Sequence, residues 1–169
     1  MYHPIEIDPS VSLDEKKKAM IKRWDKQFNL MLEYGLTRDI IKQAMYSEDD
    51  MLREGNELFF DMLHKHNIPL IFLSASGLGY ESVYYCLEHE KKLFDNIDII
   101  SNAFIRDEDG KAIGVREPII HSFNKDETII KNFPIYEDIK DRKNVLLLGD
   151  GLGDSHMADG FDHENIIKI

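Results

Sequence analysis

Hydrophobic residues recur at helical spacing over the first third of the chain. Along residues 12–34 they fall on one face of a helix, and Ser12 and Glu15 form a capping box at its start. Gly35 follows this stretch, and the helix is predicted to end there because glycine commonly ends helices. The apolar face carries Met20, Ile21, Trp24, Phe28, Met31 and Leu32.

Two further helices are predicted before the pattern changes. Thr37 begins a shorter helix that runs to about Met45, and Ser47 with Asp50 begins a third. The apolar positions of this third helix are Leu52, Leu58, Phe59, Met62 and Leu63. We therefore expect a mostly helical region over residues 1–54.

Beyond this region, short continuous apolar runs alternate with helical patterns. Such runs are typical of strands buried in a parallel sheet. The alternation predicts an α/β fold, in which an open, mostly parallel sheet over residues 55–169 carries helices on its faces. The predicted strands cover residues 68–73, 97–100, 145–148 and 166–169, a hairpin covers 104–115, and helices cover 80–91 and 126–133.

A glycine-rich turn with two carboxylates follows one of these strands. Asp150 and Asp154 are four residues apart in the run Gly149–Asp154, at the end of a strand where parallel sheets bind their ligands. Glycines allow the tight bending that brings both carboxylates toward one point, and carboxylate oxygens suit Mg²⁺. The spacing alone is equally compatible with an exposed Asp-Gly turn.

Two other polar residues are candidates for binding an anion. Ser74 follows the strand over 68–73 and begins a Ser/Gly-rich turn whose hydroxyl and backbone N–H groups can cradle a phosphate. Taken alone, the pattern favours an ordinary strand-to-helix connection with a serine N-cap. Lys125 opens a predicted helix, where the helix dipole disfavours a cation unless it faces an anion. The alternative for Lys125 is a solvated surface side chain.

Composition narrows the classes of protein to which the chain can belong. Its 32 acidic and 21 basic residues give a formal charge of −11, which makes nucleic acid an improbable partner. Cys86 is the only cysteine, so no internal disulfide can form. The start of the chain lacks a signal-peptide pattern, and no apolar run approaches the about 18 residues of a membrane helix. We expect a cytosolic protein, with no membrane partner, that is a monomer.

The order of the three candidate sites resembles motifs two, three and four of the haloacid dehalogenase (HAD) superfamily of phosphohydrolases. Longer runs around the same residues are similar to the cytosolic 5′-nucleotidase III, or pyrimidine 5′-nucleotidase, family within it. The resemblance covers essentially the whole chain and implies an α-helical cap over residues 1–54 and a HAD-like Rossmannoid core over 55–169. The matching runs are 72–75, 121–125 and 147–160, with 5–55 resembling the family's cap.

The resemblance implies Mg²⁺-dependent hydrolysis of nucleoside 5′-monophosphates. Ser74 and the backbone of Ala75 would hold the phosphate, and Lys125 would neutralise its charge. Asp150 would bind Mg²⁺, and Asp154 would complete or orient the metal shell. Gln27 stands where relatives carry a small hydroxyl residue, so the base preference is open. The implied nucleoside contacts in the cap are Glu6, Trp24 and Gln27; for Trp24 plain core packing is the alternative.

The family's nucleophile is the one motif without a counterpart. An apolar strand ending in Asp-x-Asp-x-Thr/Val should precede the cap, whereas Glu6–Ser10 has Glu in the first place and no strand before it. Asp107 and Asp109 lie in the hairpin turn, after the second motif. The sheet should therefore lack its central first strand. We interpret the chain as a fragment of a working 5′-nucleotidase rather than a catalytically inactive Mg²⁺/nucleotide-binding module, and expect no turnover from these 169 residues.

Overall fold

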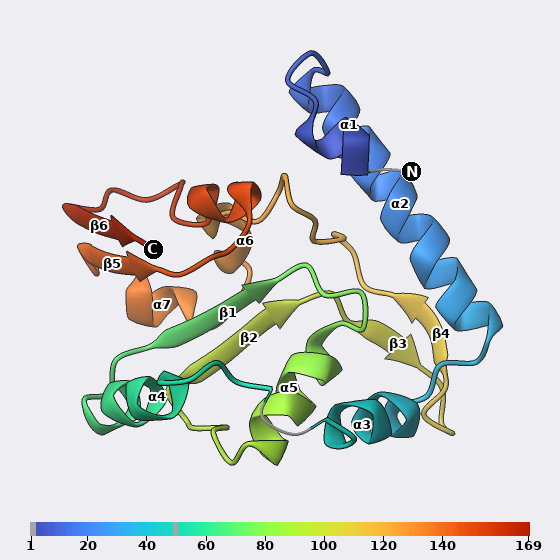
Figure 1. Ribbon diagram of the computed structural model, residues 1–169, viewed down its shortest axis with the longest axis horizontal. Helices are drawn as coiled ribbons and strands as arrows, with labels where there is room; N and C mark the ends of the chain where they lie inside the picture. Colours follow the sequence, from blue (N-terminus) through green and yellow to red (C-terminus); the bar gives the residue numbers. More distant parts are fainter. Residues whose placement is uncertain (1–2, 49–50) are drawn as a thin grey trace. The chain divides into compact units, whose positions relative to one another are not determined.

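The computed structural model describes residues 3–48 and 51–169 (Figure 1). By internal packing the chain forms two units, one of residues 23–119 and one of residues 1–22 with 120–169. Each unit is described by itself below. The division into cap and core between residues 54 and 55 rests on the resemblance and stays a prediction.

The first long helix has the capped start that the sequence predicts. α1 (His3–Ile7) is short, and α2 (Leu13–Glu33) follows it. The Ser12 hydroxyl accepts the Glu15 N–H at 3.3 Å, and the Glu15 carboxylate accepts the Ser12 N–H at 3.2 Å, which confirms the capping box. Ile21, which was predicted to lie on the apolar face, is 44% exposed and so lies outside the buried face of the helix. Ile21 lies about 100° around the helix axis from Met20, the residue before it, which is buried.

The next two helices are α3 (Arg38–Tyr46) and α4 (Asn56–Lys65). α3 begins after Thr37, as predicted. The predicted start of the third helix is wrong, because Ser47 is the C-cap of α3 and its hydroxyl donates to a backbone carbonyl one turn earlier at 2.8 Å. A short hydroxyl side chain can bond to the backbone at either end of a helix, so the residue type alone does not tell start from stop. Asp50, also used in that prediction, lies outside the described residues.

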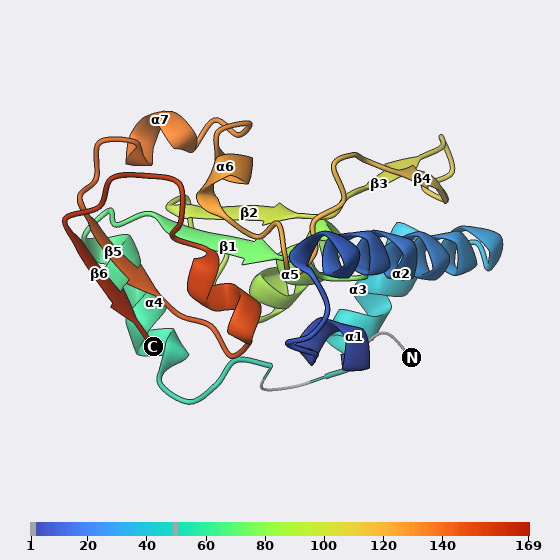
Figure 2. The same ribbon diagram turned by 90° about the horizontal axis from the view of Figure 1, so that it is seen from above.

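A parallel strand pair and a hairpin organise the unit of residues 23–119. The two parallel strands pair in register, with Ser74 opposite Ser101 at their carboxyl ends. The helix between them packs against the second strand, and α3 packs on that helix (Figure 1). The parallel pair and the antiparallel hairpin (Figure 2) confirm the predicted strands of this region. The elements are β1 (Leu70–Ser74), α5 (Tyr80–His89), β2 (Ile97–Ser101), β3 (Phe104–Arg106) and β4 (Ala112–Val115).

An aromatic cluster lies at the centre of this unit. The ring of Phe28 meets the ring of Phe104 edge-on, with centroids 5.8 Å apart, and stacks on Trp24 at 5.5 Å. Phe28 is buried, whereas Trp24 is half-buried at the margin of the cluster. The buried members are Phe28, Ile41, Tyr85, Phe104, Ala112 and Ile119.

A buried ion pair joins the hairpin to α5. Arg106 and Glu81 have side chains 7% and 14% exposed, and the Arg106 Nε donates to the Glu81 carboxylate at 2.7 Å. A second guanidinium nitrogen of Arg106 donates to the Gly110 carbonyl at 2.8 Å, which closes the hairpin turn onto the same side chain. Burial by itself would raise the pKa of Glu81, but hydrogen bonds from Arg106 and Arg38 outweigh it and hold that pKa below its ordinary value.

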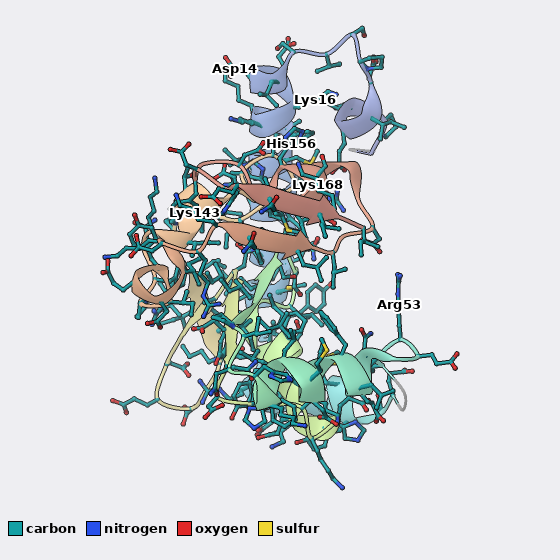
Figure 3. The ribbon with its side chains drawn as sticks, turned by 90° about the vertical axis from the view of Figure 1, so that its left-hand side faces the viewer. Asp14, Lys16, Arg53, Lys143, His156 and Lys168 are labelled. Atoms are coloured by element: carbon teal, nitrogen blue, oxygen red, sulfur yellow. The ribbon has the colours of Figure 1, made fainter. Side chains whose placement is uncertain are left out.

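The unit of residues 1–22 and 120–169 contains a second parallel strand pair (Figure 3). Lys143 lies directly before the first strand of the pair, and Lys168 is the last residue of the second. The predicted helix over 126–133 is shorter in the structure, and the helix α7 was not predicted. No helix of the described residues is long and apolar enough to span a membrane. The elements are α6 (Glu127–Ile130), α7 (Tyr136–Ile139), β5 (Asn144–Leu147), the 3₁₀ helix η1 (Leu152–His156) and β6 (Asn165–Lys168).

The expectation that these last two strands are buried is wrong. Leu147 is buried, but β6 is exposed along its whole length, and one face of the pair presents a row of accessible apolar side chains. A continuous apolar run predicts a strand. Whether its two faces are buried depends on which other elements pack on them, and the sequence of the strand does not contain that information. The accessible residues of this face are Leu146, Leu148, Ile167 and Ile169.

Candidate active site

An ion pair connects two of the predicted site residues across 29 positions of sequence. Lys125 Nζ donates to Asp154 Oδ1 at 2.5 Å, and the two side chains are 13% and 16% exposed. The other carboxylate oxygen, Oδ2, accepts the Gly151 N–H at 3.0 Å. Burial alone would raise the pKa of Asp154, but the hydrogen bonds from Lys125 and from the backbone N–H groups of Gly151 and Asp150 outweigh it and lower the pKa. Asp154 is therefore an ionised carboxylate held at both oxygens.

Glycines explain how the loop after β5 reaches this arrangement. A Cβ added at Gly149 would lie 2.4 Å from the Cβ of Asp154, and one added at Gly153 would lie 2.6 Å from the carbonyl oxygen of Ser122. Both distances are too short for a side chain. The missing side chains let the loop fold back on Asp154 and against the segment that leads to Lys125.

The same loop has the oxygen chemistry that a divalent cation prefers. Mg²⁺ is usually held in proteins by one or two carboxylates, with water and substrate phosphate completing the shell. Asp150 is exposed at the turn, while both oxygens of Asp154 already accept hydrogen bonds. The assignment of Asp150 as the ligand and of Asp154 as the group that completes or orients the metal shell comes from the family resemblance. No set of three or more His, Cys, Asp or Glu side chains converges among the described residues, so the metal assignment stays a prediction.

The hydroxyl of Ser74, the last residue of β1, already accepts one hydrogen bond. The Oγ atom of Ser74 accepts the Ser76 N–H at 3.2 Å, which leaves the hydroxyl hydrogen of Ser74 to donate to an anion. Gly79 is the N-cap of α5, so the alternative in which Ser74 is an ordinary N-cap does not hold. Ala75 lies half-buried in the same loop.

Trp24 and Gln27 of α2 lie against this loop. A Cβ added at Gly77 would lie 2.1 Å from Nε2 of Gln27 and 2.9 Å from Cζ3 of Trp24. The α2 helix and the loop therefore approach each other as closely as a glycine permits. Of the predicted site residues, one unit holds Trp24, Gln27, Ser74 and Ala75, and the other holds Glu6, Lys125, Asp150 and Asp154.

One buried polar residue was missed by the sequence-based site. His121 is 2% exposed, and its Nδ1 accepts the Phe123 N–H at 3.2 Å. Burial and the charge of Lys17 lower its pKa, while the charge of Glu6 acts in the opposite direction. The charge of Glu6 therefore favours the protonated form of His121, while burial and Lys17 favour the neutral form. The signal that could have identified His121 was its place at the start of the run 121–125 that the sequence singled out.

Replacing Gly77 with alanine is expected to move Gln27 and disturb Trp24. The amide end of Gln27 can swing away, but the indole ring of Trp24 is stiff and must shift with its neighbours. Trp24 is the only tryptophan, so a shift of the fluorescence emission maximum reports the change. Gly114→Ala is the control, because its Cβ would meet Ile105 at an ordinary 3.5 Å. Identical emission from both variants would contradict the close approach.

The family model described as "Pyrimidine 5′-nucleotidase (UMPH-1)" matches residues 1–169, and the chain belongs to this family. The predicted family is therefore confirmed.

Curated relatives match almost the whole chain. The 7-methylguanosine phosphate-specific 5′-nucleotidase A of Xenopus laevis is 36% identical over 170 residues, which cover 100% of this chain and 58% of the relative. The human 7-methylguanosine phosphate-specific 5′-nucleotidase is 37% identical over 99% of this chain and 56% of its own length. The putative cytosolic 5′-nucleotidase 3 of Caenorhabditis elegans is 34% identical, over 96% of this chain and 43% of the relative. The chain thus spans about half the length of these relatives.

A solved structure has the same fold. The crystal structure of cytosolic 5′-nucleotidase IIIB bound to cytidine matches with a TM-score of 0.85 at 31% sequence identity. The match covers 99% of this chain and 56% of that one. The predicted HAD-like α/β fold class is therefore confirmed.

Proposed function

We propose that this chain is part of a 5′-nucleotidase that hydrolyses nucleoside 5′-monophosphates to nucleoside and phosphate. The observation that carries the proposal is the ion pair at 2.5 Å between Lys125, which lies just before α6, and Asp154, which lies on the loop after β5. Phosphoryl transfer depends mainly on positioning and charge stabilisation, and a preorganised cation held by a carboxylate provides both. The names of the relatives and of the solved neighbour support a cytosolic enzyme of this kind.

The side chains have separate roles toward the phosphate. The Ser74 hydroxyl and the Ala75 N–H would hold phosphate oxygens, since the Ser74 hydrogen is left to donate. Lys125 would neutralise phosphate charge, and its contact with Asp154 would keep the ammonium group in place. Asp150 would hold Mg²⁺, oriented through Asp154. When bound, Mg²⁺ would act as a Lewis acid toward a phosphoryl oxygen.

The nucleoside would be bound by cap residues. Trp24 offers an aromatic surface beside the loop after β1, and Gln27 offers amide donors and acceptors at the same place. Glu6 is the third nucleoside contact of the proposal. The base remains open in the proposal, because the Xenopus and human relatives are named for 7-methylguanosine phosphate and the solved neighbour holds cytidine.

Calorimetric titration with CMP, 7-methyl-GMP and cytidine tests this proposal. At least one of the two nucleotides is expected to bind more tightly in the presence of Mg²⁺, while cytidine binding is expected to be insensitive to the metal. The difference arises because only the nucleotides carry a phosphate to share with the ion. Absence of nucleotide binding, or equal binding with and without Mg²⁺, would contradict the proposal.

The same preparation is expected to release no phosphate from CMP. No residue of the sequence matches the nucleophile motif, and the uncatalysed reaction is among the slowest known. Robust phosphate release that disappears in Asp150→Asn would show that a nucleophile is present after all.

A further inference from the structure

The loop after β1 contains a chain of hydrogen bonds to which the proposed roles assign no function. Ser82 donates its hydroxyl hydrogen to the Gly79 carbonyl at 2.8 Å, and its Oγ lies 2.9 Å from the Oγ of Ser76. Because Ser82 has only one hydroxyl hydrogen, Ser76 is the donor in the contact between the two hydroxyls. The Ser76 Oγ in turn accepts the Leu78 N–H at 3.2 Å. Ser82 is buried, so the loop is held from the α5 side by a polar group shielded from water.

Asn102 holds the same loop from the β2 side. This residue follows β2 and is 2% exposed. Its Nδ2 donates to the Ser76 carbonyl at 3.3 Å, and its own main-chain carbonyl accepts the Tyr80 N–H at 2.6 Å. A Cβ added at Gly79 would lie 2.6 Å from that carbonyl oxygen, so the loop lies directly on Asn102. Asn102 therefore fixes both the middle of the loop and the start of α5.

The network ends at the hydroxyl group assigned to the phosphate. The Ser76 N–H donates to the Oγ of Ser74, so the position of Ser76 decides how the Ser74 hydroxyl is oriented. Asn102 binds the carbonyl of Ser76 and Ser82 binds its side chain. Loss of either contact allows Ser76 to move and removes the restraint on Ser74.

We propose that Asn102 is a positioning residue for phosphate binding, which acts through Ser76 on the hydroxyl of Ser74. The inference rests on the proposed function, since it requires Ser74 to bind phosphate. Asn102 does not itself contact the ligand in this scheme. Its effect is therefore confined to ligands with a phosphate, and binding of the nucleoside alone does not depend on it.

The test compares the affinity of the Asn102→Leu variant for CMP with its affinity for cytidine. Leucine has nearly the shape of asparagine and adds no charge, but it removes the donor to the Ser76 carbonyl. The affinity for CMP with Mg²⁺, measured by calorimetry, is expected to fall about tenfold, while that for cytidine changes less than about twofold. Amide hydrogen exchange at Ser76 and Leu78 is expected to quicken without ligand.

Asn96→Leu is the matched control. The Asn96 Nδ2 also donates to a backbone carbonyl, that of Ile68 at 2.8 Å, but at the opposite end of the β1–β2 pair. This variant is expected to keep the CMP-to-cytidine affinity ratio of the wild type. Ser82→Ala releases Ser76 from its other side and is expected to lower CMP affinity selectively as well, so the inference stays testable if Asn102→Leu folds poorly.

The outcomes separate the inference from the function on which it rests. A wild-type chain that binds neither CMP nor cytidine would overturn both together. A wild type that binds CMP, with Asn102→Leu and Ser82→Ala binding it equally well, would overturn the inference and leave the function standing. Parallel losses of CMP and cytidine affinity would also overturn it, since they would indicate general damage rather than positioning of the phosphate loop.

Discussion

Replacing Arg106 with methionine is expected to lower the free energy of unfolding by about 3 kcal/mol. The substitution leaves the Glu81 carboxylate buried at 14% exposure with most of its compensating charge removed. It also removes the donor to the Gly110 carbonyl and so loosens the hairpin turn. Breaking one side of a buried pair costs more than the pair itself contributes, because the remaining charge stays out of water.

Urea unfolding followed by Trp24 fluorescence measures this loss, because Trp24 lies in the same unit as the ion pair. Lys42→Met is the control in the same unit: its pair with Glu88 has more exposed side chains, at 42% and 34%, and its removal is expected to change stability much less. A loss in Arg106→Met no larger than that in the control would show that the buried pair does not stabilise this unit.

The same pair makes stability depend on pH in a defined direction. The pKa of Glu81 in the folded protein lies below its ordinary value of 4.5, so its stabilising contribution is present above that value. The contribution is lost as the pH falls through the folded pKa. Glu81→Gln is therefore expected to lose less stability than the wild type between about pH 7 and about pH 3 in the same urea experiment. Equal losses would contradict the lowered pKa.

Replacing Lys125 with methionine is expected to weaken CMP binding about a hundredfold, a loss typical of a charge-assisted contact to an anion. The variant loses the cation proposed to face the phosphate and leaves the Asp154 carboxylate without its partner at 2.5 Å. That carboxylate then repels the phosphate. The affinity for cytidine, which has no phosphate, is expected to stay within about twofold.

Lys143→Met is the matched control, because it removes the same charge from the same unit at an exposed position. The Lys143 Nζ donates to the carbonyl of Asp162 at 3.2 Å, not to a carboxylate of the candidate site. Calorimetric titration of both variants with CMP and with cytidine distinguishes a local contact of Lys125 with the phosphate from the effect of losing one positive charge. Equal CMP affinities in the two variants would refute the assignment of Lys125.

Local signals in the sequence predicted a large part of this structure. Ser12 and Glu15 cap α2 as their spacing indicates, because a capping box needs only residues three apart in sequence. The strands were identified for the same reason, since a short apolar run bounded by polar turns is a local pattern. Lys125 and Asp154, separated by 29 residues, were grouped only through their resemblance to a family, and the structure joins them by an ion pair.

What the sequence could not provide depends on distant contacts. Ser47 caps the end of α3 instead of starting a helix, because its hydroxyl bonds backwards along the chain. The exposure of Leu146 and Leu148 depends on elements outside β5. The sequence did not single out Asn102, because an asparagine after a strand is compatible with many kinds of contact. Its hydrogen-bond partner, Ser76, lies in a loop 26 residues earlier.

The close approach at Gly77 also restricts how the sequence can change over evolution. Its two neighbours, Gln27 and Trp24, leave no space for even a methyl group while Gln27 keeps its present position. A lineage that gains a side chain at position 77 must shorten or move residue 27 and also shift the Trp24 ring, whereas this contact does not prevent residue 27 from becoming smaller while position 77 is glycine. The two positions are therefore expected to be epistatic, and the order in which they mutate limits the sequences that this contact can reach.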